Sequence, residues 1–369
     1  MRFYAYLNPQ TRGPEEDAEI IESVYEQAIA ADRAGFAGIC LTDHHFSDYN
    51  TYGNPFMFGA ALSRQLEQAW IILTVAVLPT YNPMRLAQEI NLLDILTKGR
   101  SIVALGAGGS PLEFAGLGRD PATRAELFDQ NLEIMLGAWA ADVEADGPFA
   151  YETAHEHGVL LGRIMPGPYR KPHPMLARGV VSDGSMLATA RRGWPIFFGR
   201  TNVEQTATRL GLYRAELEAS GHSQEVIDEC LRWTATQKTV YLAETDELAM
   251  EQAREPLANL GRLSKRAFQA VQPNDAVKAS SEEETKALLG ISANDREAFI
   301  EGATIIGSPE TVTARIQEYA DAGVENLALH FTWGYNDLDR VKRSFELFTD
   351  EVMPRFAGSQ QAISAGGLS

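Results

Sequence analysis

Short apolar runs alternate with amphipathic stretches along the first third of the chain. The runs at 2–7, 35–43, 71–78 and 101–106 predict strands. Between them, apolar residues recur at helical spacing near 17–34, 54–68 and 83–96. Alternation of this regularity is typical of βα units that build a parallel sheet.

The same alternation resumes in the second half after a helix predicted at 119–138. Further strands are predicted at 174–180, 194–199, 236–243 and 326–331. Helices are predicted near 183–192, 202–220, 246–260 and 336–350. The total of eight strand candidates favours an α/β fold of the (β/α)₈ TIM-barrel type over a doubly wound sheet.

Two stretches interrupt this pattern, and we interpret them as insertions near 140–173 and 256–303. The first is rich in Pro, Gly and His and predicts a small hairpin. The second is polar and acidic from 261 onward, and we expect a lid or mobile loop there. The prediction is one barrel domain over 1–355, followed by a flexible tail at 356–369.

Composition narrows the classes of function. The formal net charge of −18 would repel phosphate backbones and anionic lipid, so neither nucleic acid nor a membrane is an expected partner. No segment reaches the roughly 18 apolar residues that span a bilayer, and no signal peptide is visible, so we expect a cytoplasmic protein. Cys40 and Cys230 are expected to be buried and unpaired.

An acid followed by two imidazoles stands directly after the second predicted strand. In a barrel, side chains after strand ends face the active site at the carboxyl-terminal mouth. Asp43, His44 and His45 therefore offer groups that titrate near neutral pH beside a carboxylate. The alternatives are a helix cap by Asp43 with solvated histidines, or part of a metal site.

Three further features could face the mouth. LGAGGSP at 105–111 lets the backbone approach a flat ligand at Gly106, Ala107 and Gly108, although a plain turn explains these glycines equally well. Ser182 and Ser185 stand at a predicted helix start, where phosphate binding and N-capping are alternatives. His330 ends the last strand, with a site role and a structural role both open.

The segment LTDHHFSDYNTYGNP (41–55) strongly resembles the bacterial luciferase-like monooxygenases. The resemblance continues through 77–100, the SDGS segment, 306–312 and 345–354 in the same order and spacing. It implies a barrel that binds reduced FMN, supplied by a separate NAD(P)H:flavin reductase. In that family the flavin reacts with O₂ to give a C4a-(hydro)peroxide, which oxygenates a small organic substrate such as an aldehyde or ketone.

The resemblance also implies roles for individual residues. His44 matches the catalytic histidine, His45 a second active-site histidine, and Asp43 an acid near the flavin ring. Thr74 and Val75 match a non-prolyl cis peptide that supports the flavin. The flavin and phosphate segment is matched by Val180, Val181, Ser182 and Ser185, and a phosphate-side arginine by Arg124.

One departure from the family lies after the fourth strand. Gly106 and Ala107 stand where luciferase has a reactive cysteine and a phosphate-binding arginine, and Arg100, Arg178 or Arg200 are candidates to replace that arginine. The alternatives are a deazaflavin F420-dependent oxidoreductase on the same barrel and a non-catalytic flavin-binding partner subunit, although such subunits lack the full acid-His-His arrangement that this sequence retains. The resemblance also implies a dimer through the helices at 54–68 and 83–96, either a homodimer or a heterodimer.

Overall fold

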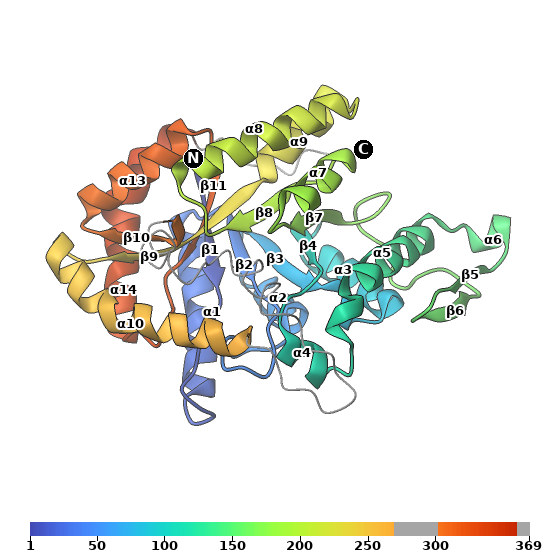
Figure 1. The fold of residues 1–369 in the computed structure, drawn as a ribbon, viewed down its shortest axis with the longest axis horizontal. Helices are drawn as coiled ribbons and strands as arrows, with labels where there is room; N and C mark the ends of the chain where they lie inside the picture. Colours follow the sequence, from blue (N-terminus) through green and yellow to red (C-terminus); the bar gives the residue numbers. More distant parts are fainter. Residues whose placement is uncertain (269–301, 360–369) are drawn as a thin grey trace.

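A computed structural model of the chain describes residues 1–268 and 302–359. In it, parallel strands form a closed ring that helices surround (Figure 1). The barrel strands are β1 (Arg2–Leu7), β2 (Gly38–Leu41), β3 (Trp70–Val77), β4 (Ser101–Gly106), β7 (Met175–Gly179), β8 (Ile196–Gly199), β9 (Ala235–Leu242) and β11 (Asn326–His330). The predicted (β/α)₈ barrel is confirmed.

The ring closes because every barrel strand pairs in parallel with two neighbours. β1 pairs with both β2 and β11, and β8 pairs with β9 through Phe197–Gly199 and Ala235–Gln237. All carboxyl ends of the barrel strands therefore lie at one mouth. The loops that leave these ends carry the site residues predicted from the sequence.

Helices cover the outside of the ring (Figure 1). They are α1 (Asp17–Ala34), α2 (Pro55–Leu62), α3 (Pro83–Leu96), α4 (Pro111–Gly116), α5 (Arg124–Ala140), α7 (Asp183–Arg191), α8 (Val203–Ala219), α9 (Gln224–Trp233), α10 (Asp246–Ala267), α13 (Pro309–Asp321) and α14 (Leu338–Leu347). Many begin at a polar N-cap whose side chain accepts a backbone N–H, as Asn54, Asn82 and Ser308 do. None of the helices in the described part of the chain is long and apolar enough to cross a membrane.

Two apolar layers hold the barrel together. Side chains inside the ring include Tyr4, Cys40, Ile72, Ala104, Ala177 and Ala328. A larger cluster lies between the ring and its helices, and includes Phe3, Leu41, Leu73, Leu105, Leu176 and Leu329. Cys40 and Cys230 are both buried and free, as predicted.

The first insertion contains the predicted hairpin. It comprises α6 (Val143–Asp146), β5 (Phe149–Glu152) and β6 (His157–Leu160), with β5 and β6 antiparallel. The hairpin lies outside the ring near α5 (Figure 1). Its turn is tied to the barrel by Arg119, whose Nη2 lies 2.7 Å from Oε1 of Glu156.

Several predicted boundaries were wrong. α10 continues to Ala267, so the second insertion does not begin at 256; its remainder at 269–301, including the proposed lid, lies outside the described residues. β10 (Thr304–Gly307) is an additional strand that pairs with the second half of β9. A 3₁₀ helix covers Met353–Ser359, where a flexible tail was expected from 356, and 360–369 lie outside the described residues.

Candidate active site at the barrel mouth

Asp43 is buried at the mouth, directly after β2. Its Oδ2 accepts a hydrogen bond from the backbone N–H of Val77 at 2.9 Å and from the hydroxyl of Tyr81 at 3.0 Å. The carboxylate therefore ties the end of β2 to the end of β3. A helix cap by Asp43 with solvated histidines was the alternative, and it is wrong.

His45 forms an ion pair with this carboxylate. Its Nε2 lies 2.9 Å from Oδ1 of Asp43, although the contact lacks the alignment of a regular hydrogen bond. Burial alone would lower the pKa of His45, but the carboxylates of Asp43 and Glu113 outweigh that effect and raise the pKa above its ordinary value. The site therefore favours the positively charged form of His45.

His44 contacts a different carboxylate. Its Nδ1 lies 2.9 Å from Oε1 of Glu113, and the same oxygen accepts the backbone N–H of His45 at 3.2 Å. The Glu113 side chain is only 2% exposed, whereas that of His44 is 21% exposed. The two imidazole rings therefore contact separate carboxylates, and within residues 1–268 and 302–359 no hydrogen bond engages Nε2 of His44.

Glu113 and Tyr81 were not predicted from the sequence. Glu113 lies in the first turn of α4, a short helix that the hydrophobic pattern did not show. One signal was present: Ser110-Pro-Leu-Glu113 matches a capping box with Pro at N1, which predicts a helix start. Ser110 does cap α4, but the Glu113 side chain turns to the histidines.

Aromatic rings surround His44 on the mouth side. The His44 ring lies edge-on to Tyr49 at 4.9 Å and to Phe268 at 6.1 Å between centroids. The guanidinium of Arg200, in the loop after β8, lies 6.0 Å from the Phe268 ring. Two aromatic rings therefore line one side of His44, and the guanidinium of Arg200 lies beyond the second of them.

Val75 lies at an irregularity of β3 and packs between two neighbouring strands. The Thr74–Val75 peptide bond is cis, as the resemblance implied, and the register with β4 shifts between Thr74 and Ala76. A Cβ atom on Gly106 would lie 2.5 Å from Val75 Cγ2, and one on Gly179 would lie 2.3 Å from Val75 Cγ1. Glycine is therefore required at both positions while valine occupies this site.

The loop after β4 is shaped by a second close approach. Gly108 has a φ of +74°, and a Cβ there would meet Val77 at 2.6 Å and Phe114 at 2.7 Å. Ala107 packs against the outer core. Both features account for the glycine-rich loop structurally, and flavin binding by Gly106, Ala107 and Gly108 remains a prediction.

The segment predicted to hold phosphate lies at the start of α7. Ser182 is its N-cap and accepts the Ser185 N–H, so the capping alternative is confirmed, and phosphate binding stays a prediction. Val181 is exposed. Val180 is buried in a cluster formed by α7, β8, α8 and α9, so only its backbone could contact a ligand. Arg124 starts α5, where it donates to the Pro121 carbonyl.

The candidate replacement arginines lie in different places. Arg100 donates to the carbonyls of Leu66, Glu67 and Ala69 at the amino end of the barrel, which removes it as a candidate. Arg178 lies 3.5 Å over the ring of Phe128, outside the ring of strands, and burial lowers its pKa to about 10. Arg200 lies at the mouth.

Arg209 of α8 lies beside the α7 segment instead. It donates to the Val181 carbonyl at 3.0 Å, and its Nε lies 3.7 Å from Asp183. Sequence reasoning did not consider this arginine, because helical spacing alone does not show which face of α8 meets α7.

His330 is buried at the end of β11. Its Nε2 donates to the Asn8 carbonyl at 3.1 Å, and burial lowers its pKa to about 4. A neutral, buried imidazole that joins β11 to the loop after β1 has a structural role.

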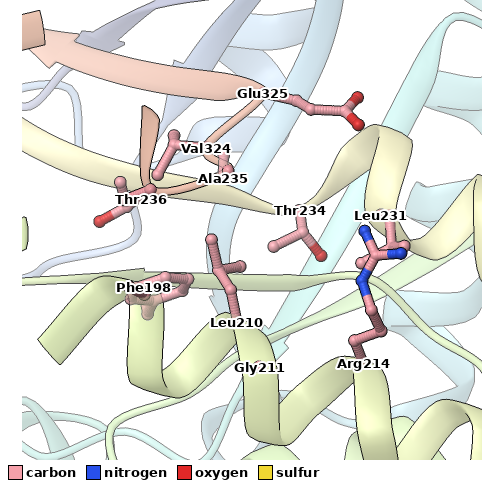
Figure 2. A pocket seen from close by; sticks show the side chains of 13 residues that line it. Phe198, Leu210, Gly211, Arg214, Leu231, Thr234, Ala235, Thr236, Val324 and Glu325 are labelled. Carbon is pink, nitrogen blue, oxygen red and sulfur yellow. The ribbon is translucent and has the colours of Figure 1, made fainter. Parts of the chain in front are cut away.

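A cavity of about 240 Å³ lies away from the mouth, between α8, the start of β9 and the turn before β11. Figure 2 shows Leu210 and Arg214 on α8, facing Thr234 and Ala235, with Glu325 on the opposite side. None of the sequence-predicted site residues lines it. The candidate site therefore stays at the mouth.

Solved structures share this fold over nearly the whole chain. The oxygenating constituent of 3,6-diketocamphane monooxygenase from Pseudomonas putida, in complex with FMN, has a TM-score of 0.75 at 20% identity, covering 96% of this chain and 98% of that chain. An F420-dependent secondary alcohol dehydrogenase has a TM-score of 0.70 at 16% identity with the same coverage. At these identities the likeness shows the fold.

A match to a family model identifies the family, and sequence relatives agree with it. The chain is 23% identical to the alkanal monooxygenase alpha chain of the Kryptophanaron alfredi symbiont, over 96% of this chain and 98% of that one. A Sinorhizobium fredii protein described as "Uncharacterized protein y4vJ" is 26% identical, but the match covers only 61% of this chain and 62% of that protein. The model of the family described as Luciferase-like monooxygenase matches residues 1–326. With that match over most of its length, the chain belongs to the luciferase-like monooxygenase family.

Proposed function

We propose that this chain is the oxygenase of a two-component system. It would bind reduced FMN delivered by a separate NAD(P)H:flavin reductase and use O₂ to oxygenate a small organic substrate, such as an aldehyde, a ketone or a related apolar compound. The observation that carries the proposal is the pair of histidines at the mouth, each with its own buried carboxylate. Flavin binding without catalysis would not require two histidine–carboxylate pairs, which argues against a non-catalytic subunit.

The residues at the mouth fit a flavin. Val75, held between Gly106 and Gly179, offers a small apolar platform for a flat ring. Ser182 and Ser185 stand at the start of the nine-residue helix α7, where hydroxyls and backbone N–H groups suit a phosphate, and Arg209 lies beside them. These features support binding by Thr74, Val75 and the α7 segment.

Reduced FMN, when bound, supplies the electrons that activate O₂. The protein contributes proton control and exclusion of water. We assign the movement of a proton at Nε2 to His44, because its Nδ1 is held by Glu113. The charged form of His45 would stabilise negative charge that develops nearby, and Tyr49 and Phe268 would bind apolar parts of the substrate.

An F420-dependent oxidoreductase is the alternative, because Gly106 and Ala107 depart from the luciferase pattern and one solved neighbour carries an F420–acetone adduct. Anaerobic equilibrium dialysis with reduced FMN and with F420 separates the two. We expect reduced FMN to bind at least about tenfold more tightly, a difference of about 1.4 kcal/mol. Preferential binding of F420, together with turnover that needs no O₂, would overturn the proposal.

We also propose that two copies of the chain form a cytoplasmic homodimer through α2 and α3. Met57 on α2 is 73% exposed, and Leu92 and Ile95 on α3 are 48% and 38% exposed. Apolar side chains exposed on two adjacent helices are suited to a protein interface. A heterodimer through the same face is the alternative.

A further inference from the structure

We infer that Glu113 is a positioning residue for His44: its carboxylate holds the proton on Nδ1 and leaves Nε2 as the proton acceptor at the mouth. This inference rests on the proposed function of His44. It goes further by naming the residue that sets the tautomer and the direction of the imidazole.

The chemistry of the contact fixes the tautomer. The distance of 2.9 Å between Nδ1 and Oε1 is that of a hydrogen bond, and an ionised carboxylate can only accept. With Glu113 ionised, Nδ1 is the donor and carries the proton. In a neutral imidazole the other nitrogen, Nε2, then has the free lone pair that a proton carrier needs.

The position of Glu113 is itself held from two sides. The same oxygen accepts the backbone N–H of His45, so one carboxylate fixes both the ring of His44 and the chain that follows it. On its other side, Ser110 caps the start of α4 and donates its hydroxyl to the Ala267 carbonyl at the end of α10. A buried carboxylate in this setting has little freedom to turn away from His44.

The two histidines make the test specific. His45 has its own ion pair with Asp43, which does not pass through Glu113. Removing the Glu113 carboxylate should therefore change the tautomer of His44, whereas His45 loses a backbone acceptor and one charge that raises its pKa but keeps its side-chain contact with Asp43. A general loss of packing would disturb both histidines.

The experiment measures the imidazole ¹⁵N signals of His44 in the flavin-free protein. We compare the wild type with Glu113→Met, which keeps the length of the side chain but removes the acceptor. The wild type is expected to show the Nδ1–H tautomer, and the variant to lose it. If the folded variant keeps the wild-type ¹⁵N pattern, the inference is wrong.

If Glu113→Met does not fold, a more conservative variant tests whether Glu113 sets the tautomer of His44. Glu113→Gln keeps an acceptor of the same shape and loses the charge, and Glu156→Gln is the matched control, since Glu156 is 11% exposed and contacts Arg119 away from the histidines. A neutral amide can either accept from or donate to Nδ1, so we expect the ¹⁵N signals of His44 in Glu113→Gln to show a mixture of both tautomers, unlike those in Glu156→Gln. The same change should lower kcat by about 10- to 100-fold, with the affinity for reduced FMN changed by less than about threefold. A wild-type ¹⁵N pattern of His44 in Glu113→Gln, together with equal kcat in the two Gln variants, would overturn the inference.

The proposed function and this inference can fail separately. If no substrate is oxygenated by the wild type, the proposed function fails. The ¹⁵N measurement needs neither flavin nor substrate, so it still shows whether Glu113 sets the tautomer of His44.

Discussion

Cγ1 of Val75 lies 2.3 Å from the point that a Cβ atom on Gly179 would occupy. Valine is branched at Cβ and cannot move its methyl groups away as a flexible side chain can. Gly179→Ala is therefore expected to destabilise the protein by about 1–3 kcal/mol through overpacking, and to weaken binding of reduced FMN. Urea unfolding and anaerobic titration measure the two effects.

Two controls make this prediction specific. Gly211→Ala on α8 meets no atom within 4 Å and should be neutral or stabilise by about 0.5–1 kcal/mol. In a Val75→Ala background, Gly179→Ala should lose most of its cost, because the two sites are coupled. Equal costs of Gly179→Ala in both backgrounds would show that Val75 is not the cause.

His45 should stabilise the fold more at acidic than at alkaline pH. Asp43 and Glu113 raise its pKa in the folded protein above the unfolded value. The stabilisation is therefore fully present below about pH 6.5 and is lost as pH rises through the folded pKa. His45→Gln is expected to cost more unfolding free energy at pH 6 than at pH 9, with the exposed His157→Gln as control. If His45→Gln lowers the unfolding free energy equally at pH 6 and pH 9, the pKa of His45 is not raised in the folded protein.

Lys238 should have the opposite dependence. It is buried on β9, where Nζ donates to the carbonyls of Thr201 and Gly302, and burial lowers its pKa to about 7. Between about pH 7 and pH 10 the unfolded chain binds more protons than the folded one, so stability rises with pH. From about pH 7 to about pH 10, the unfolding free energy of the wild type should therefore rise relative to that of Lys238→Met. For the exposed Lys342→Met control, the difference in unfolding free energy from the wild type should not change with pH. If the difference between the wild type and Lys238→Met is equally independent of pH, the pKa of Lys238 is not lowered.

The α2–α3 face is tested by matched charge insertions. Leu92→Glu on α3 should convert the dimer to a monomer in sedimentation velocity, because a charge in an apolar interface is not compensated. Leu212→Glu on α8 is the control, since Leu212 is 46% exposed against 48% for Leu92. A monomeric wild type, or equal behaviour of the two variants, would exclude this interface.

The barrel was predictable because its strands are buried on both faces and read as apolar runs at regular spacing. β10 was missed because the four residues Thr304–Gly307 are too few to show a period. α9 was missed for a different reason: it directly precedes β9, where the barrel pattern leads one to expect a single helix between strands. Both errors concern elements added to the barrel, and neither moves the mouth.

The candidate site was predictable only in part. Asp43, His44 and His45 are consecutive, so a position after a strand end is enough to place them at the mouth. Glu113 reaches His44 across 69 positions of the chain, and Arg209 reaches Val181 across 28. Contacts of this kind depend on how α4 and α8 pack on the barrel, and no local pattern records that packing.

His44 is proposed to carry the proton chemistry of a flavin-dependent oxygenation at the barrel mouth. The most direct measurement supplies ¹⁸O₂ and reduced FMN to the wild type and to His44→Ala with a panel of small aldehydes and ketones. We expect ¹⁸O in the product of the wild type and a turnover rate at least about 100-fold lower in the variant. Affinity for reduced FMN should change by less than about threefold, under 1 kcal/mol. Unchanged turnover in a folded His44→Ala variant would show that His44 does not carry this proton chemistry.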